Sequence, residues 1–266
     1  YYANGFISKI QIILMVKIIV ATTLHDPNGD MSDMISKYGE RVKSIVNSLH
    51  IVVSETTSPK IVDLLKPCVH VIKICHSKHN RDTYVDTLKS AFEEASETDR
   101  ILYADYDRLL HWYSSYPEEL SDVLTGYPDV DFYHIARTKR AFDTHPETQK
   151  RTEILANELG SKLLKFTETH DMLSACYGFS KRLLKEIFSV ECRTELGFYA
   201  LWSYWAYCKA EKWEYREVEG QEWETPDRFQ KEIKEQGFEK WSLQFQTSKE
   251  WQRRVDLLAD CLRELM

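Results

Sequence analysis

Short apolar runs alternate with amphipathic stretches through the first hundred residues. The apolar runs are rich in β-branched residues and predict buried strands at 16–22, 50–54, 69–74 and 100–104. Between them, apolar residues recur every three or four positions, which is typical of helices with one buried face. The predicted helices are 32–49, a short one that begins at Ser58-Pro59, and 80–97. Strands separated by helices of this length favour βαβ crossovers, so we predict an α/β fold with a mainly parallel sheet.

The second half of the chain has a less regular pattern. It predicts helix 117–126, strand 130–138, helix 146–165, strand 173–179, helix 181–189, aromatic helix 195–210, strand 214–220 and charged helices at about 226–236 and 248–265. No linker rich in Pro, Gly or Ser separates the halves, and no internal repeat is present. We therefore predict one domain over residues 16–229, with 230–266 as its helical C-terminal extension and 1–15 as an N-terminal extension.

Composition and charge indicate which kinds of binding partner and which cellular compartment to expect. The chain has 266 residues, of which 43% are hydrophobic and 29% charged, as in ordinary soluble proteins. Its net charge of −7 argues against a broad basic surface for nucleic acid, so an anionic substrate would meet a few well-placed cations. The six cysteines show no metal-finger spacing, which fits a reducing compartment. We expect a cytoplasmic protein, with peripheral contact to a membrane and a homodimer both left open.

The apolar N-terminal stretch 6–24 is predicted to be neither a membrane span nor a secretory signal. Lys9, Gln11 and Lys17 interrupt it, so no uncharged run reaches the length of about 18 residues that a span requires. It also lacks a small-residue cleavage site. Its second half reads as the first strand, and Met15 is one candidate for the natural start.

Two aspartates follow the fourth predicted strand, in the stretch "ILYADYDRLLHW" at 101–112. Ligands of parallel sheets bind outside the carboxyl ends of the strands, and Asp105 and Asp107 lie at such an end. In extended chain, residues two apart share a face, so both carboxylates could approach one Mg²⁺ or Mn²⁺ ion together with diphosphate oxygens. Taken alone, the spacing favours a local role, in which Asp105 ends the strand and Asp107 caps the next helix.

Further motifs follow in order along the chain. They are the D-x-D after the fourth strand, "FYHIART" at 132–138, "DMLSACYGFSKRLLKEIF" at 171–188, and the aromatic helix and strand within 194–229. Their order resembles that in the GT-A glycosyltransferases and, more narrowly, in the family-2-type inverting enzymes that include dolichyl-phosphate mannose synthases. Each motif is loose, but together they span residues 16–229 in the order of that family.

This resemblance implies a metal-dependent transfer of a sugar from a nucleotide-diphosphate donor to an unknown acceptor, with inversion. Asp105 and Asp107 would bind Mn²⁺ or Mg²⁺ and the diphosphate. Glu195 would be the general base that deprotonates the acceptor hydroxyl, with Asp171 as a second candidate. An acid at that position is also favoured simply because it opens a helix.

Several cations are candidates for contacting the donor. The resemblance places Arg137 near the sugar nucleotide, and Arg140 lies three residues further on in a local basic cluster suited to phosphates. Arg81 lies beside a predicted helix N-terminus, a place that also suits a phosphate. The alternative for these residues is a solvated loop whose charges pair with surface acids.

The chain departs from the family pattern at three places. After the first strand, "TTLHDPNGDM" leaves Asp26 and Asn28 as the nearest polar candidates for contacting the donor. After the second strand, Glu55 or Thr56 stands where the family has an aspartate that reads the base. The acceptor-side segment has lost a glycine and an arginine within 175–178.

Two alternatives therefore stay open. One is a non-catalytic relative that binds nucleotide sugars, and the other is a sugar nucleotidyltransferase, whose glycine-rich opening is absent here. The sequence contains no H-E-x-x-H, P-loop, dinucleotide-binding or G-x-S-x-G motif, which argues against zinc hydrolases, P-loop enzymes, dinucleotide enzymes and α/β-hydrolases.

Overall fold

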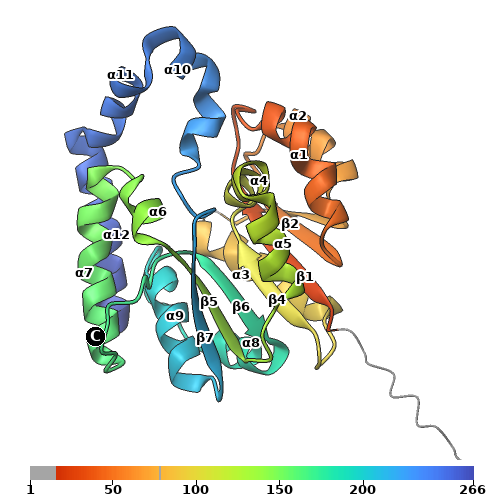
Figure 1. The fold of residues 1–266 in the computed structure, drawn as a ribbon, viewed down its shortest axis with the longest axis vertical. Helices are drawn as coiled ribbons and strands as arrows, with labels where there is room; N and C mark the ends of the chain where they lie inside the picture. Colours follow the sequence, from red (N-terminus) through yellow and green to blue (C-terminus); the bar gives the residue numbers. More distant parts are fainter. Residues whose placement is uncertain (1–15, 78) are drawn as a thin grey trace, which may run out of the picture.

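Among the residues that the structure describes, a seven-stranded sheet forms the centre, with helices on both faces (Figure 1). The computed structural model describes residues 16–77 and 79–266, so the predicted N-terminal extension lies outside the described residues. The strands are β1 (Ile18–Leu24), β2 (Ser48–Ser54), β3 (Val71–Cys75), β4 (Arg100–Ala104), β5 (Phe132–Arg137), β6 (Cys176–Ser180) and β7 (Trp213–Val218).

The order of strands across the sheet is β3-β2-β1-β4-β6-β5-β7. The pairs β3–β2, β2–β1, β1–β4 and β5–β7 are parallel, whereas β6 runs antiparallel to both of its neighbours. The predicted α/β class with a mainly parallel sheet is therefore confirmed. Because four parallel strands share one direction, the carboxyl ends of β1, β2 and β4 meet at one edge.

Helices connect the strands and then continue beyond the sheet. They are α1 (Ser32–Ser44), α2 (Pro59–Cys68), α3 (Asn80–Glu94), α4 (Tyr106–Ser115), α5 (Pro117–Thr125), α6 (Lys139–Asp143), α7 (Glu147–Leu163), α8 (Lys181–Phe188), α9 (Phe198–Lys209), α10 (Gln230–Gln236), α11 (Phe238–Ser242) and α12 (Ser248–Leu265). Two short 3₁₀ helices, η1 (Thr225–Phe229) and η2 (Leu243–Gln246), lie in the C-terminal part.

The largest error in a predicted boundary is at the end of the first helix. The helix predicted over 32–49 ends at Ser44, and β2 already begins at Ser48. Ser48 and Leu49 pair with Ile19 and Val20 of β1, so the sheet takes over residues that the apolar pattern assigned to the helix.

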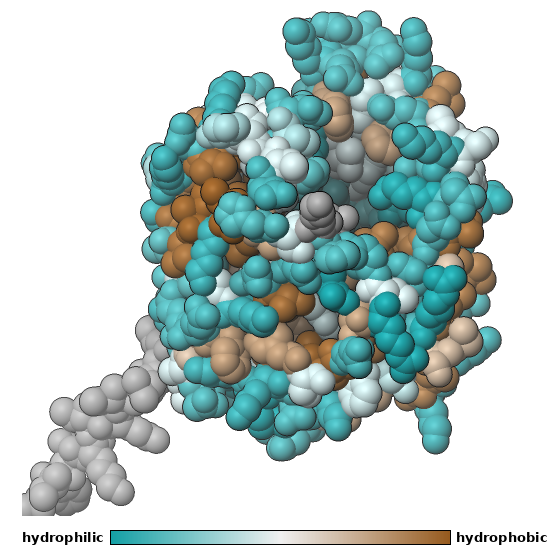
Figure 2. All heavy atoms as spheres, turned by 180° about the vertical axis from the view of Figure 1, so that it is seen from behind, coloured by the Kyte–Doolittle hydropathy of each residue, from teal (hydrophilic) through white to brown (hydrophobic). Residues whose placement is uncertain are grey.

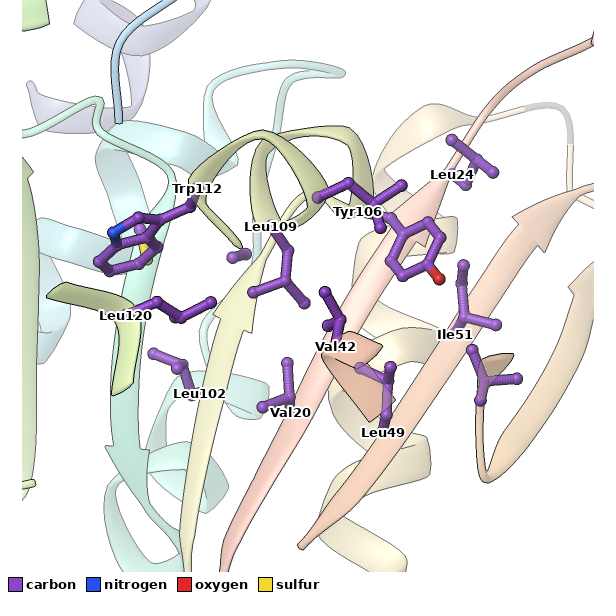
Figure 3. Close-up of a cluster of buried hydrophobic side chains, with 14 of the residues drawn as sticks. Val20, Leu24, Val42, Leu49, Ile51, Leu102, Tyr106, Leu109, Trp112 and Leu120 are labelled. Atoms are coloured by element: carbon purple, nitrogen blue, oxygen red, sulfur yellow. The ribbon is translucent and has the colours of Figure 1, made fainter. Parts of the chain in front are cut away.

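Alternate residues of β1 pack into two different cores, one on each face of the sheet. Val20 contributes to the core under α1, α2, α4 and α5, whose members include Leu102, Leu109 and Trp112 (Figure 3). Ile19 contributes to the opposite core, which α3, α8 and α9 cover. Each fully buried aliphatic side chain stabilises the fold by about 1.5–3 kcal/mol, so these two layers fix the sheet that carries the site.

A third, smaller core holds the C-terminal helix α12 against α7 and α9. Cys261 and Leu265 of α12 are buried against Ala156 of α7 and Ala200 of α9. α7 and α12 lie side by side along one flank of the molecule (Figure 1). Residues 230–266 are mainly helical, and the packed helices α7 and α12 supply a wall of the cavity described below.

No helix among the described residues is long and apolar enough to cross a membrane. All six cysteines carry free thiols.

Candidate functional site

A cavity of about 360 Å³ opens at the carboxyl edge of the sheet. The ends of three strands supply its floor through Thr23, His25, Ser54 and Asp105. The surface seen from behind the view of Figure 1 is hollowed below its uppermost part (Figure 2). This is the edge at which an open parallel sheet binds its ligands.

Helices supply the remaining walls of the cavity. Tyr84, near the start of α3, lies on one side, and Tyr199 of α9 contributes a second ring. The packed helices α7 and α12 close the cavity with Glu153, Arg254 and Leu257. The cavity therefore combines aromatic rings, charged groups and strand ends, as small-molecule sites commonly do.

Asp105 is the carboxylate of the D-x-D pair that lines this cavity. Its oxygen Oδ1 accepts hydrogen bonds from the hydroxyl of Tyr103 and from Oγ1 of Thr23, the latter at 3.0 Å. Burial raises the pKa of Asp105 to about 6, against an ordinary value of 3.8. At neutral pH this carboxylate is ionised at an energetic cost, which a bound cation would relieve.

Asp107 lies in the first turn of α4, and Arg228 binds it. Oδ2 of Asp107 accepts a hydrogen bond of 2.6 Å from Nη2 of Arg228, and Oδ1 accepts the backbone N–H of Arg108 at 2.9 Å. Burial alone would raise the pKa of Asp107, but the charges of Arg228 and Arg108 outweigh it, so the pKa is lowered. The two aspartates thus have different surroundings, although one residue separates them.

Arg108 also lines the cavity, with 7% of its surface exposed. One of its terminal nitrogens donates to the carbonyl oxygen of Ser174 and, at 3.5 Å, to Gln221. Its Nε has no hydrogen-bond partner and lies 3.8 Å from Oε2 of Glu224, which also has none. A buried polar group with an unused donor is costly, so this guanidinium is a candidate for contacting an anionic ligand.

The residues present do not assemble a divalent-metal site in this arrangement. Asp105 offers one carboxylate to the cavity, whereas Arg228 already occupies Asp107. Within residues 16–77 and 79–266, no group of three or more His, Cys, Asp or Glu side chains could hold a metal ion. Mn²⁺ or Mg²⁺ therefore stays a prediction from the sequence.

Arg137 and Asp171 lie in a separate buried network rather than on this cavity. Two nitrogens of Arg137 donate to Asp171 at 2.6 Å, and one also donates to Glu153 at 2.7 Å. Burial alone would raise the pKa of Asp171, but the charge of Arg137 outweighs it and lowers it to about 2. Both residues line a second cavity of about 330 Å³. A carboxylate with so low a pKa is a weak base at neutral pH. We therefore interpret the bonds between Arg137, Asp171 and Glu153 as structural.

Arg140, Arg81 and Glu195 each have partners on the surface. Arg140 donates to Glu219 and, at 2.6 Å, to Glu222, and it is absent from the lining of the cavity. Arg81 donates to the backbone oxygen of Cys192 at 2.7 Å. Oε2 of Glu195 lies 3.0 Å from Nδ1 of His79, and the next residue, Leu196, lines the cavity. Of these three residues, Glu195 alone is next to a lining residue.

The candidates after the first two strands have local roles in the structure. Asp26 is fully buried, and its carboxylate accepts the backbone N–H groups of Gly29, Asp30 and Met31 at 2.9–3.0 Å. It therefore orders the turn into α1. Glu55 is exposed and lies 3.5 Å from His76.

Sequence reasoning missed most of the polar lining. Asp26 and Glu55 were predicted to contact the donor, but the residues next to them, His25 and Ser54, line the cavity instead. The position of these residues at strand ends was the available signal, because side chains at one sheet edge converge. Arg253 and Arg254 of α12 gave no such signal, since their approach depends on how the C-terminal helix docks.

Comparisons with known proteins give weak likenesses. No family model matches the sequence, and no curated protein matches it. The similar solved structures include glucosyl-3-phosphoglycerate synthase from M. tuberculosis, 16% identical, with 71% of this chain and 64% of that chain covered and a TM-score of 0.44. TarS residues 1–349 from S. aureus in complex with UDP is 13% identical, with 93% and 71% covered and a TM-score of 0.46. A further mycobacterial protein is 13% identical, with 71% and 60% covered and a TM-score of 0.46.

These likenesses are too low to carry a functional argument. The chain spans 60% and 64% of the length of the two mycobacterial structures.

Proposed function

We propose that this protein binds a nucleotide-diphosphate sugar in the cavity and transfers the sugar to an acceptor, with inversion. The observation that carries the proposal is the position of Asp105. It directly follows β4 and lines a cavity at the carboxyl edge of the sheet, as the GT-A resemblance implies. The order of motifs along the sequence supports the same fold family.

In the proposed reaction, an acceptor oxygen attacks the anomeric carbon while the bond from that carbon to the diphosphate breaks. Negative charge then grows on the leaving diphosphate, and the buried guanidinium of Arg108 is placed to stabilise it. Glu195 would accept the proton of the acceptor hydroxyl, since it lies beside the lining residue Leu196. The Mn²⁺ or Mg²⁺ predicted from the sequence would supply further charge stabilisation if bound.

The first test is ligand binding measured by thermal shift. Wild-type protein, Asp105→Ala and Asp105→Ala/Asp107→Ala would be heated with nucleoside diphosphates and nucleotide sugars, each with and without Mn²⁺. A ligand at about 100 times its Kd adds about 2.7 kcal/mol to the unfolding free energy, so binding is visible as a raised Tm. We expect the shift in wild type to be lost in both variants. Asp129→Ala is the control, because Asp129 pairs with Arg100 at the opposite edge of the sheet.

Product analysis then separates the alternatives. Release of a nucleoside diphosphate from the bound sugar nucleotide indicates glycosyl transfer or its hydrolytic side reaction, whereas release of pyrophosphate from a nucleoside triphosphate indicates a nucleotidyltransferase. Binding without either product would indicate a non-catalytic relative. The last candidate has specific support, since Asp26 and Asp107 are both engaged by the protein itself.

A further inference from the structure

Residues 219–229, here called the strap, cross α4 on their way from β7 to α10. The carboxylate of Glu119 accepts the backbone N–H groups of Glu219 and Gly220, each at 2.9 Å. A Cβ atom at Gly220 would lie 1.7 Å from the ring of Trp112, so the backbone of the strap passes directly over that ring. The start of the strap is thereby fixed to α4 and α5.

Charge pairs fix the rest of the strap along α4. His111 bonds to Asp227 at 2.7 Å and to Glu222 at 3.2 Å, through its two ring nitrogens. Glu224 of the strap lies 3.8 Å from Arg108, which is one turn before His111 on α4. These contacts hold η1, and with it Arg228, in one position relative to the D-x-D pair.

Arg228 connects the strap to the site. Its Nη2 donates to Asp107 at 2.6 Å, and its Nη1 lies 3.4 Å from the carbonyl oxygen of His25, which lines the cavity. Only 20% of the Arg228 side chain and 17% of the Asp107 side chain are exposed. A guanidinium has five N–H donors, and these two contacts use two of those on Arg228. Arg228 itself is not among the lining residues of the cavity, but the contacted His25 and the strap residues Glu224 and Thr225 are.

We propose that Arg228 is the cation of the donor site, and that the site binds a nucleoside diphosphate without a divalent metal. The inference rests on the proposed function and names how that function binds its donor. In this proposal, Arg228 lies between Asp107 and the diphosphate and bonds to both. The sequence assigned this role to Mn²⁺ or Mg²⁺. The guanidinium fork suits phosphate oxygens, and Arg108 supplies a second one on the cavity wall.

Competition for Asp107 is the physical basis of this proposal. One of its oxygens accepts a backbone N–H, and the other accepts the hydrogen bond from Arg228. A metal ion could bind Asp107 only by displacing a partly buried guanidinium, and the strap contacts hold that group in place. Removing the guanidinium should therefore free Asp107 for a metal.

The experiment measures binding of UDP, GDP, ADP, CDP and dTDP to the full chain by calorimetry, in EDTA and in Mn²⁺. The variants are Arg228→Met, which keeps the stem and removes the charge, and Arg228→Lys, which keeps the charge. Arg100→Met is the matched control, since Arg100 is a similarly buried arginine that binds an aspartate, Asp129, at the far edge of the sheet.

We expect wild type and Arg100→Met to bind one diphosphate in EDTA, with no requirement for Mn²⁺. Arg228→Met should bind at least about tenfold more weakly in EDTA and recover in Mn²⁺, because the metal then takes the place of the guanidinium. Arg228→Lys should fall between the two. Recovery in Mn²⁺ also shows that the variant is folded.

Three results would overturn the inference. Wild-type binding that requires Mn²⁺ would assign the cation to the metal. Equal binding by wild type and Arg228→Met in EDTA would remove Arg228 from the site. The absence of binding by any protein in either condition would refute the proposed function, and this inference with it.

Discussion

Ala175 has a backbone conformation that favours glycine. Its φ is 53°, in the left-handed region, and the residue is buried on the wall of the cavity. A residue with a Cβ atom is strained in this conformation.

Ala175→Gly should raise the unfolding free energy. Relief of the left-handed conformation contributes about 1–2 kcal/mol, and the extra freedom of glycine in the unfolded chain offsets about 0.5–1 kcal/mol. We expect a net gain of about 0.5–1 kcal/mol, measured by urea unfolding. Lys165→Gly, at a φ of 59° after α7 and off the cavity wall, is the matched comparison and should give a similar gain. A loss of stability in Ala175→Gly alone would show that its methyl group contributes packing that outweighs the strain.

At this scale, the sequence predicts some roles and leaves others hidden. The position of Asp105 at the cavity was predictable because this residue directly follows an apolar strand. The local role of Asp26 was not, because its three backbone hydrogen bonds depend on a turn that the pattern does not describe. The partnership of Asp107 with Arg228 joins residues 121 positions apart, and no local signal indicates it.

At the scale of elements, α4 and the strap form one electrostatic unit, with His111 at its centre. Burial lowers the pKa of His111, but its hydrogen bonds to Asp227 and Glu222 outweigh this effect, so the pKa is raised above 6.5. The folded protein therefore holds this proton more tightly than the unfolded chain does. The stabilisation is complete below about pH 6.5 and is lost as the pH rises through the raised pKa.

His111→Gln should weaken this dependence on pH. The wild-type unfolding free energy should fall as the pH rises above 6.5, and the variant should show a flatter curve over the same range. Urea unfolding at pH 6, 7, 8 and 9 measures the two slopes. Parallel curves would mean that the neutral imidazole of His111 holds the strap as well as the protonated one does. His79→Gln is the control, since His79 is exposed and lies away from the strap.

The elements themselves were predicted well, apart from their ends. Strands 100–104 and 130–138 and helix 181–189 were placed within two residues because their periodicity is strong and turns separate them. Helix 32–49 was too long, because pairing of Ser48 and Leu49 with β1 outweighs their helical spacing. The antiparallel direction of β6 was not predicted, since direction depends on the path of the connecting chain.

At the scale of the whole molecule, the two edges of the sheet differ in what their charges do. At the carboxyl edge, burial raises the pKa of Asp105 to about 6, so its charge destabilises the fold at neutral pH. At the amino edge, Glu94 bonds to Lys17, His50 and Ser48, and these bonds outweigh burial and lower its pKa to about 2. The charge of Asp105 at the carboxyl edge therefore lowers the stability of the fold at neutral pH, whereas the charge of Glu94 at the amino edge raises it.

Asp105→Asn should stabilise the protein at neutral pH by about 1–2 kcal/mol while it weakens donor binding. The gain should shrink as the pH falls from 6 toward 3.8, because the wild-type carboxyl then takes up a proton in the folded state. Thermal unfolding from pH 4 to 8 measures this difference. A variant that is less stable than wild type at pH 7 would mean that the hydrogen bonds from Tyr103 and Thr23 require the charge.

Glu94→Gln should have the opposite effect. Its depressed pKa contributes stability above about pH 4.5, and this contribution is lost as the pH falls toward 2. We expect a loss of about 1 kcal/mol at pH 7, a modest value because the side chain is 31% exposed, with little difference from wild type near pH 2. Nucleotide binding should be unchanged, since Glu94 lies at the edge away from the cavity.

The place of β6 in the sheet also affects how the chain folds during synthesis. β4 pairs with β1 on one side and with β6 on the other, but β4 ends at Ala104 and β6 begins at Cys176. A ribosome adding roughly 5–20 residues per second needs roughly 4–14 seconds to supply that partner. During this interval the backbone of β4, with Ile101, Leu102 and Tyr103, is an open edge that can pair with another nascent chain. A fragment that ends after α5 retains this edge, so we expect light scattering to show that it self-associates where the full chain does not.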